Sequence, residues 1–270
     1  MPRALSVLTA ATAVAVITVS LVACANRRPN SPSAQGGSPN ATPSASTSTP
    51  AAPNAGQSGV SNGKTYNITM AAIDGATPDG AGHWHARAGQ LSGGDPAVAE
   101  AFNKASDASA RAQIDQARSD ADGVRSWNLE VKSAVTFRPT AIGEVLTGVY
   151  YADRAAHPID YVNTVVIDSR TASLITLKDL FANEHDGLNR LSEQTKAIWP
   201  KVYGHGDGPM PDEPGNRPVE ANFANWIPTA AGIELHFRDG QLGHGSPVIT
   251  VPWSALSDVL AADMKALTQG

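Results

Sequence analysis

Serine, histidine and carboxylate residues suited to hydrolysis occur in two separate stretches of the chain. Ser246 lies in the sequence Gly-His-Gly-Ser-Pro, and His157 lies close to Asp153 and Asp160. A serine hydrolase needs a nucleophile within reach of a base, and a third group must orient that base. The proline after Ser246 disfavours the usual nucleophile elbow and removes an N–H that an oxyanion hole would use. The alternatives are a glycine-rich turn for Ser246 and a strand end for His157, which precedes a proline.

A second candidate chemistry is metal binding by His83 and His85, which flank Trp84. An H-x-H pair holds a metal ion only where further ligands converge on it. The spacing of the sequence identifies no such ligands. The alternative is a loop in which an aromatic ring lies between two solvated histidines.

Four more ionisable residues share the glycine- and proline-rich stretch 201–218, which we expect to be a long loop. They are His205, Asp207, Asp212 and Glu213. A glycosidase needs paired carboxylates, and a metal-dependent deacetylase needs a set of Asp and His ligands. Loops of this composition are usually solvated. The sequence therefore assigns no catalytic residue, no metal ligand and no cofactor.

The elements that must position these side chains predict an α+β fold. Period-two alternation and β-branched or aromatic residues predict strands at 64–73, 127–137, 144–151, 161–167, 232–237 and 248–252. Helices are predicted at 95–123, at 186–199, and from a Ser254 cap through Leu267. Because strands mostly follow strands, we expect antiparallel sheets with the helices packed on one side.

Residues 1–23 predict a secretory signal peptide. Arg3 supplies a positive charge, residues 4–22 form an uncharged apolar run, and the run ends at Cys24, the only cysteine of the chain. A retained membrane-spanning helix is the alternative, because the run is about as long as a minimal span.

The end of this run, Leu21-Val22-Ala23-Cys24, resembles the bacterial lipobox. In that motif the cysteine receives a diacylglyceryl group and becomes the first residue after cleavage. Several acyl chains give stable anchoring that a single chain does not. The resemblance implies that Cys24 binds the cell membrane through acyl chains and holds the protein on the extracytoplasmic face.

Residues 24–62 are predicted to be a disordered linker behind this anchor. The stretch is rich in Pro, Ser, Thr and Ala, and it has too few large apolar residues to offset the entropy of ordering. Removal of residues 1–23 leaves 19 basic and 25 acidic residues, which changes the formal charge from −5 to −6. An acidic chain without a long basic cluster argues against nucleic acid as a partner.

A succession of short segments resembles the DUF3298 type of domain. These segments are His157-Pro158, Val165-Val166-Ile167-Asp168, Leu177-Lys178-Asp179-Leu180-Phe181, Asn222-Phe223, Gly232-Ile233-Glu234-Leu235-His236-Phe237 and Val251-Pro252-Trp253-Ser254-Ala255-Leu256. Such domains occur in the mycobacterial secreted immunogenic protein family and outside the cell in lysozyme-sensing anti-sigma factors. The resemblance covers residues 63–270 and implies an exported α+β domain of β-grasp-like character. It implies little chemistry, since members are binding or sensing modules and some are described as esterases.

We therefore predict a lipid-anchored protein of the cell envelope with a non-enzymatic domain that binds a protein, glycan or lipid. The candidate ligand contacts are loop aromatics, namely Trp84, Tyr203 and Trp226. Core packing is the alternative for each ring. A secreted serine esterase or another envelope hydrolase is the alternative function, and a pocket near His157, His244 and the loop 201–218 would favour it.

Overall fold

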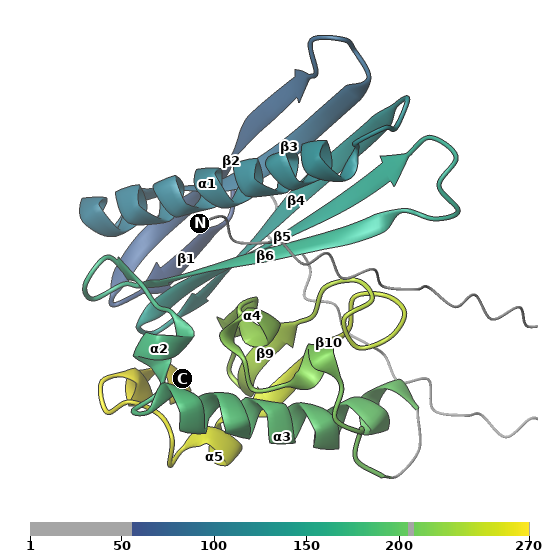
Figure 1. Ribbon diagram of the computed structural model, residues 1–270. Helices are drawn as coiled ribbons and strands as arrows, with labels where there is room; N and C mark the ends of the chain where they lie inside the picture. Colours follow the sequence, from purple (N-terminus) through teal and green to yellow (C-terminus); the bar gives the residue numbers. More distant parts are fainter. Residues whose placement is uncertain (1–55, 205–207, 270) are drawn as a thin grey trace, which may run out of the picture. The chain divides into compact units, whose positions relative to one another are not determined.

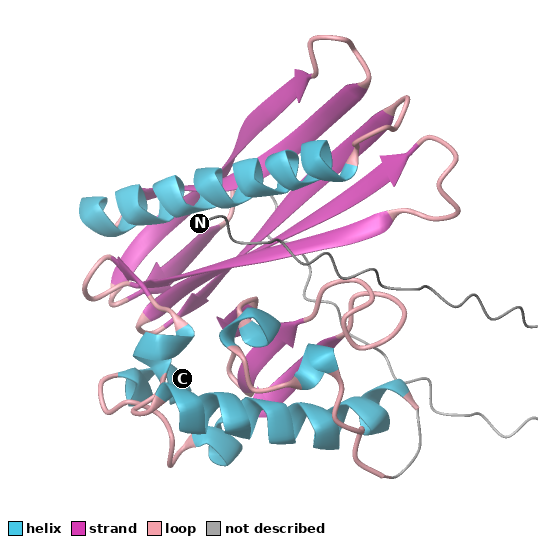
Figure 2. Cartoon of the chain, viewed as in Figure 1, coloured by secondary structure: helices cyan, strands magenta, loops and turns pink. Residues whose placement is uncertain are grey.

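The computed structural model describes residues 56–204 and 208–269, which belong to one compact unit of the chain (Figure 1). Figure 2 shows that helices and strands are both well represented in it. The predicted signal peptide, Cys24 and most of the predicted linker lie outside the described residues.

Seven strands form a large sheet in which the spatial order follows the sequence. They are β1 (Ser58–Ser61), β2 (Lys64–Ala76), β3 (Gly82–Gly93), β4 (Trp127–Arg138), β5 (Ala141–Ala152), β6 (Ile159–Asp168) and β7 (Ser173–Leu174). All neighbours are antiparallel except β3 and β4. These two run parallel because helix α1 (Pro96–Asp120) connects them, as crossover helices commonly do.

Helix α1 starts where the sequence predicts and packs on one face of the large sheet (Figure 1). The Asp95 carboxylate caps it by accepting the backbone N–H groups of Ala97 at 2.9 Å and Val98 at 3.4 Å. Small residues on the inner face, such as Ala110, let the helix approach the sheet closely. Phe102 is fully buried in the core between them.

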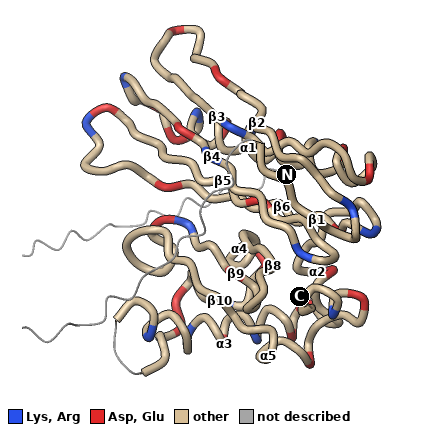
Figure 3. Tube along the Cα trace, turned by 180° about the vertical axis from the view of Figure 1, so that it is seen from behind, with Lys and Arg blue, Asp and Glu red and all other residues tan. Residues whose placement is uncertain are grey.

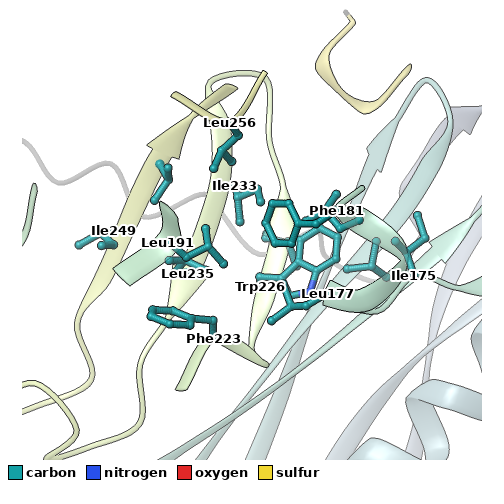
Figure 4. Packing of buried hydrophobic residues seen from close by; sticks show 14 of the residues in the cluster. Ile175, Leu177, Phe181, Leu191, Phe223, Trp226, Ile233, Leu235, Ile249 and Leu256 are labelled. Atoms are coloured by element: carbon teal, nitrogen blue, oxygen red, sulfur yellow. The ribbon is translucent and has the colours of Figure 1, made fainter. Parts of the chain in front are cut away.

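A smaller sheet lies in the C-terminal part of the chain. Its antiparallel strands are, in spatial order, β10 (Val248–Pro252), β9 (Gly232–His236) and β8 (Trp226–Pro228). The helices of this part are α2 (Leu177–Leu180), α3 (Glu184–Tyr203), η1 (Pro214–Asn216), α4 (Glu220–Phe223), α5 (Trp253–Leu256) and η2 (Met264–Thr268). Helix α3 packs against β10. Figure 4 shows the core formed here, in which Leu191, Leu235 and Trp226 lie close together.

Strand β6 lies between the two cores. Val165 and Ile167 belong to the core under α1, whereas Val162 and Val166 belong to the C-terminal core. The alternation of strand side chains between two faces explains this division. A hydrogen bond also joins β6 to the smaller sheet, because Oγ1 of Thr164 accepts the backbone N–H of Trp226 in β8 at 2.9 Å.

The predicted α+β class is confirmed, and so are the predicted strands and the helices at 95–123 and 186–199. Several elements differ from the prediction. Strand β3 was not predicted, because the stretch 74–94 is rich in glycine, which suggested a loop around His83, Trp84 and His85. Strand β1 lies within the predicted linker and pairs with β2.

The predicted C-terminal helix after Ser254 is wrong. Helix α5 ends at Leu256, and the chain then forms a bridge between Leu260 and Phe181. The backbone N–H of Ala261 donates to Leu180 at 3.0 Å, which takes this segment out of a helix. The apolar residues still enter the core, as the spacing predicted, but on an irregular backbone.

Candidate functional site

A cleft of about 380 Å³ lies beside β6. Its lining residues are Ala112, Gln113 and Gln116 from α1, residues 159–163 from β6, and Arg238 and Asp239 from the loop between β9 and β10. The volume falls in the range of roughly 300–1,000 Å³ that is common for ligand pockets. The first half of β6 thus forms the base of the cleft, with α1 and the β9–β10 loop beside it.

The pairing of β6 decides which of its backbone groups face the cleft. Strands β5 and β6 pair in an unbroken antiparallel register, so alternate residues of β6 bond to β5 and the others point outward. The N–H of Ser169 donates to Thr140, on the β5 side, whereas Val166 accepts the N–H of Ile175, on the outer side. Odd-numbered residues of β6 therefore bond to β5, and even-numbered residues point outward.

The outer edge of β6 is unpaired along the cleft. Strand β7 covers only Ile167 and Asp168. The outward N–H and C=O groups of Asp160 and Val162 form no hydrogen bond with any residue of the described ranges. Asp160 is exposed, whereas Val162 is buried, and buried backbone groups are normally paired. This edge is therefore a place where a ligand can bond.

Gln113 fixes the α1 wall of the cleft. Its side chain is buried, and Nε2 donates to the carbonyl of Leu146 at 2.9 Å and to Oδ1 of Asn163 at 3.1 Å. Its Oε1 lies over Gly148, where an added Cβ would come within 2.3 Å of it. These bonds fix the distance between α1 and the strands β5 and β6. The absence of a side chain at Gly148 permits this close approach.

The β9–β10 loop is held by side-chain bonds to its backbone. Gln241 accepts the N–H of Arg238 at 3.1 Å through Oε1 and donates to Gly215 at 3.0 Å through Nε2. Asp239 accepts the N–H of Gly245 at 3.1 Å. The backbone of this wall is thus fixed, while the Arg238 guanidinium makes no ion pair within residues 56–204 and 208–269.

Tyr161 supplies an aromatic surface to the cleft. Its ring stacks on Tyr150 with centroids 5.8 Å apart, and its hydroxyl donates to Asp120 at 2.5 Å. Burial raises the pKa of Tyr161, and the hydrogen bond to Asp120 raises it further. The phenol is therefore a neutral, oriented donor at neutral pH rather than a general base.

The charges of the cleft have both signs. Asp160 and Arg238 line it, and Asp160 also lacks an ion-pair partner in the described part of the chain. Elsewhere on the described surface, lysine and arginine are interspersed with aspartate and glutamate (Figure 3).

Among the described residues, no hydrogen bond links those that were predicted for hydrolysis. The Oγ of Ser246 is buried and has no partner among the described residues. His157 is exposed, and its Nδ1 lies 2.9 Å from the carbonyl oxygen of Pro158. Asp153 lies 3.6 Å from Arg154, and Asp160 belongs to the cleft.

A Glu–His pair near Ser246 was not considered from the sequence. His236 Nε2 lies 2.9 Å from Glu234 Oε1, and the two side chains are only 12% and 16% exposed. Val248 pairs with His236, so Ser246 lies two residues from this position. These are the residue types of a serine hydrolase, but Nε2 faces the carboxylate and no hydrogen bond reaches Ser246.

Residues 59–63 match the G-x-S-x-G spacing of a nucleophile elbow, which the sequence reasoning passed over. The structure places Ser61 at the end of β1, where it is fully buried. Its Oγ lies 2.7 Å from the carbonyl oxygen of Arg138 and 2.7 Å from Oγ of Ser169. An elbow joins a strand to a helix and exposes its serine, so this match has a structural role.

His83 and His85 lie on strand β3, not in a loop as expected. They share one face of the strand, and His85 Nδ1 lies 3.3 Å from Asp74. In the loop 201–218, Asp212 pairs with Lys196 at 2.7 Å. His205 and Asp207 lie outside the described residues. No group of three His, Cys, Asp or Glu side chains within the described ranges is placed to hold a metal ion.

Two of the three expected surface aromatics are core residues. Trp84 is 7% exposed and Trp226 is 2% exposed, because each lies on the inner face of a strand. Tyr203, at the end of α3, is 40% exposed, and its hydroxyl accepts the N–H of Val248 at 2.8 Å. Core packing, the alternative interpretation, therefore holds for both tryptophans.

The described helices include none with the length and apolar character that a membrane span requires. Cys24 and the apolar run before it lie outside the described residues.

No protein-family model and no curated protein match this sequence. The fold is similar to two crystal structures of the DUF3298 family. One, from Bacteroides fragilis, is 11% identical, with 81% of this chain and 100% of that chain covered at a TM-score of 0.53. The other, from Pseudomonas aeruginosa, is 13% identical, with 75% and 96% covered at a TM-score of 0.53. The DUF3298-type fold implied by the sequence resemblance is thereby confirmed.

Proposed function

We propose that this chain is a lipid-anchored protein of the cell envelope whose DUF3298-type domain binds a ligand without catalysing a reaction. The unpaired edge of β6 at the base of the cleft is the observation that carries the binding role. Ligand sites are usually concave and present a few fixed polar groups, and here these are backbone groups, a guanidinium, a carboxylate and amides. The location rests on Cys24 and its lipobox-like sequence.

The esterase alternative has one observation in its favour, which is the buried and unpartnered Oγ of Ser246. A nucleophilic serine needs a base within hydrogen-bond reach, or nearly so in the absence of substrate. Neither His157 nor His236 is hydrogen-bonded to Ser246. The geometry therefore gives this alternative less support than it gives binding.

Hydrolysis of p-nitrophenyl acetate and butyrate by the purified full chain separates the two functions. The wild-type protein and Ser246→Ala are compared, with Ser119→Ala as the control, because Ser119 is exposed on α1. We expect all three proteins to give the same background rate within about twofold. If the hydrolysis rate falls tenfold or more in Ser246→Ala alone, the protein is an esterase and the proposed binding function is wrong.

A further inference from the structure

We infer that the cleft binds an extended peptide segment of another protein, which pairs as an added strand with the edge of β6. The inference rests on the proposed binding function and names the class of ligand. Its first support is the set of outward backbone groups of Asp160 and Val162, which alternate as two donors and two acceptors. Peptides that add to a sheet edge bind such groups through their own main chain.

The composition of β6 leaves this edge able to pair. Natural sheet edges are usually protected by charged side chains, especially lysine, by proline or by a bulge, and the one charge on this edge is Asp160. Residues 159–166, Ile-Asp-Tyr-Val-Asn-Thr-Val-Val, contain neither lysine nor proline, and the register with β5 is free of bulges. The open part, residues 159–163, spans about 17 Å at a rise of about 3.4 Å per residue, enough for a ligand strand of some five residues.

The walls of the cleft select a single strand as the occupant. Helix α1 and the β9–β10 loop flank the edge and are fixed by the bonds of Gln113 and Gln241. A second copy of this chain would have to bring its own α1 and loop into the same space. One extended segment needs only the room between the walls.

The side chains of the cleft predict the character of this segment. Asp160 and Arg238 lie in the cleft with no ion-pair partner among the described residues. Tyr161 lies on the opposite face of β6 from Asp160, because successive residues alternate. We therefore expect the ligand strand to carry a basic residue opposite Asp160 and an acidic residue opposite Arg238, both on the same face of the strand. The residues on its other face, which point toward α1 and Tyr161, should be small or aromatic. Opposite charges on neighbouring strands stabilise pairing.

A display library of random octapeptides, selected on the detergent-solubilised full chain, tests this assignment. Selected peptides are then measured against Asp160→Pro and Asp160→Ala. Proline removes only the outward N–H, since residue 160 does not bond to β5, and alanine is the matched control that keeps this N–H. We expect about a tenfold weaker affinity for Asp160→Pro than for Asp160→Ala, as the loss of one hydrogen bond implies.

Residue-resolved amide hydrogen exchange gives an independent readout. A selected peptide should slow exchange at Asp160 and Val162, whereas Tyr161 and Asn163, already bonded to β5, should change little. Gln116→Trp, which fills the α1 wall, should abolish this protection in a protein that is otherwise intact.

Three outcomes would overturn the inference. Peptides that bind without protecting Asp160 and Val162 would leave a binding protein whose site lies elsewhere. Protection of these amides without peptide, with a dimer in sedimentation, would assign the edge to a second copy. A library that yields no binder would exclude a peptide ligand, while the esterase assay would still decide the proposed function separately.

Discussion

The carboxylate of Glu144 in β5 is fully buried between α1 and the large sheet. Its Oε1 accepts the N–H of Gly89 at 2.8 Å and the hydroxyl of Ser106 at 2.9 Å, and it also accepts the hydroxyl of Ser133. Its Oε2 has no partner among the described residues. Burial raises the pKa of Glu144, and the three hydrogen bonds oppose this shift only in part.

The raised pKa predicts a pH dependence of stability with a definite sign. The folded state holds the Glu144 proton more tightly than the unfolded state, whose pKa is near 4.5. The contribution of Glu144 to stability is therefore complete below that pKa and is lost as pH rises through the higher folded pKa. In Glu144→Gln, which stays neutral, this loss is absent. Urea unfolding from pH 4 to 8 should show the wild type losing stability relative to Glu144→Gln as pH rises.

The difference between the two proteins is the quantity to measure, because other groups act in the opposite direction. Hydrogen bonding to Arg87 lowers the pKa of Asp74, and hydrogen bonding to Thr176 lowers the pKa of Asp179. Both carboxylates are present in the wild type and in the variant, so their contributions to the pH dependence of stability cancel in the difference. A difference that stays flat with pH would show that the pKa of Glu144 is the same in the folded and unfolded protein.

The burial of Glu144 could not be predicted from the sequence. Glu144 lies in an apolar strand, where period-two alternation fits a solvated carboxylate as well as a buried one. Its burial follows from α1, which brings Ser106 over it from 38 residues away. The same limit applies to Ser246 and His236, whose neighbours depend on the pairing of β9 with β10.

At the scale of elements, glycines opposite aromatic rings fix how strands of the large sheet pack. Gly82 of β3 pairs with Trp127 of β4, and the indole lies over the glycine. A Cβ at Gly82 would come within 2.2 Å of that ring. Gly75 and Trp84 repeat the arrangement between β2 and β3.

Gly82→Ala should therefore destabilise the protein, although alanine is normally the better strand residue. The added methyl must displace the buried Trp127 ring, and overpacking of this kind costs about 1–3 kcal/mol. The free energy of unfolding from urea titration measures the effect. Gly208→Ala is the control, since no described residue lies within 4 Å of the added atom, and it should change stability by less than about 0.5 kcal/mol. Equal effects of the two substitutions would contradict the packing argument.

Elements with strong local patterns were predicted well, and those that depend on distant contacts were not. The Asp95-Pro96 start and the alternation in 127–137 gave α1 and β4 their correct places. Strand β3 was hidden because its glycines serve ring packing, as at Gly82, rather than a turn. The apolar spacing after Ser254 fits a helix, but the bond between Ala261 and Leu180 prevents one.

For the molecule as a whole, the division into two cores could not be predicted from composition or order of elements. It arises because β6 turns one face to α1 and the other to the smaller sheet. The same position leaves the first half of β6 without a strand on the side away from β5, which creates the cleft. A strand was correctly predicted at 161–167, but no local signal tells which strands will flank it.

The proposed attachment of the whole molecule to a membrane depends on Cys24, and the prediction concerns the first residue of the mature chain. Intact mass spectrometry of the protein from a bacterial host should give a chain that begins at Cys24 and carries a diacylglyceryl group. Labelled palmitate should enter the wild type, and Cys24→Ala should take up none. The apolar run 4–22 is unchanged in that variant, so it controls for adsorption of label to the leader. A mature mass that still includes residues 1–23 without lipid would instead identify a retained membrane-spanning helix, and the domain would then be displayed by that helix rather than by acyl chains.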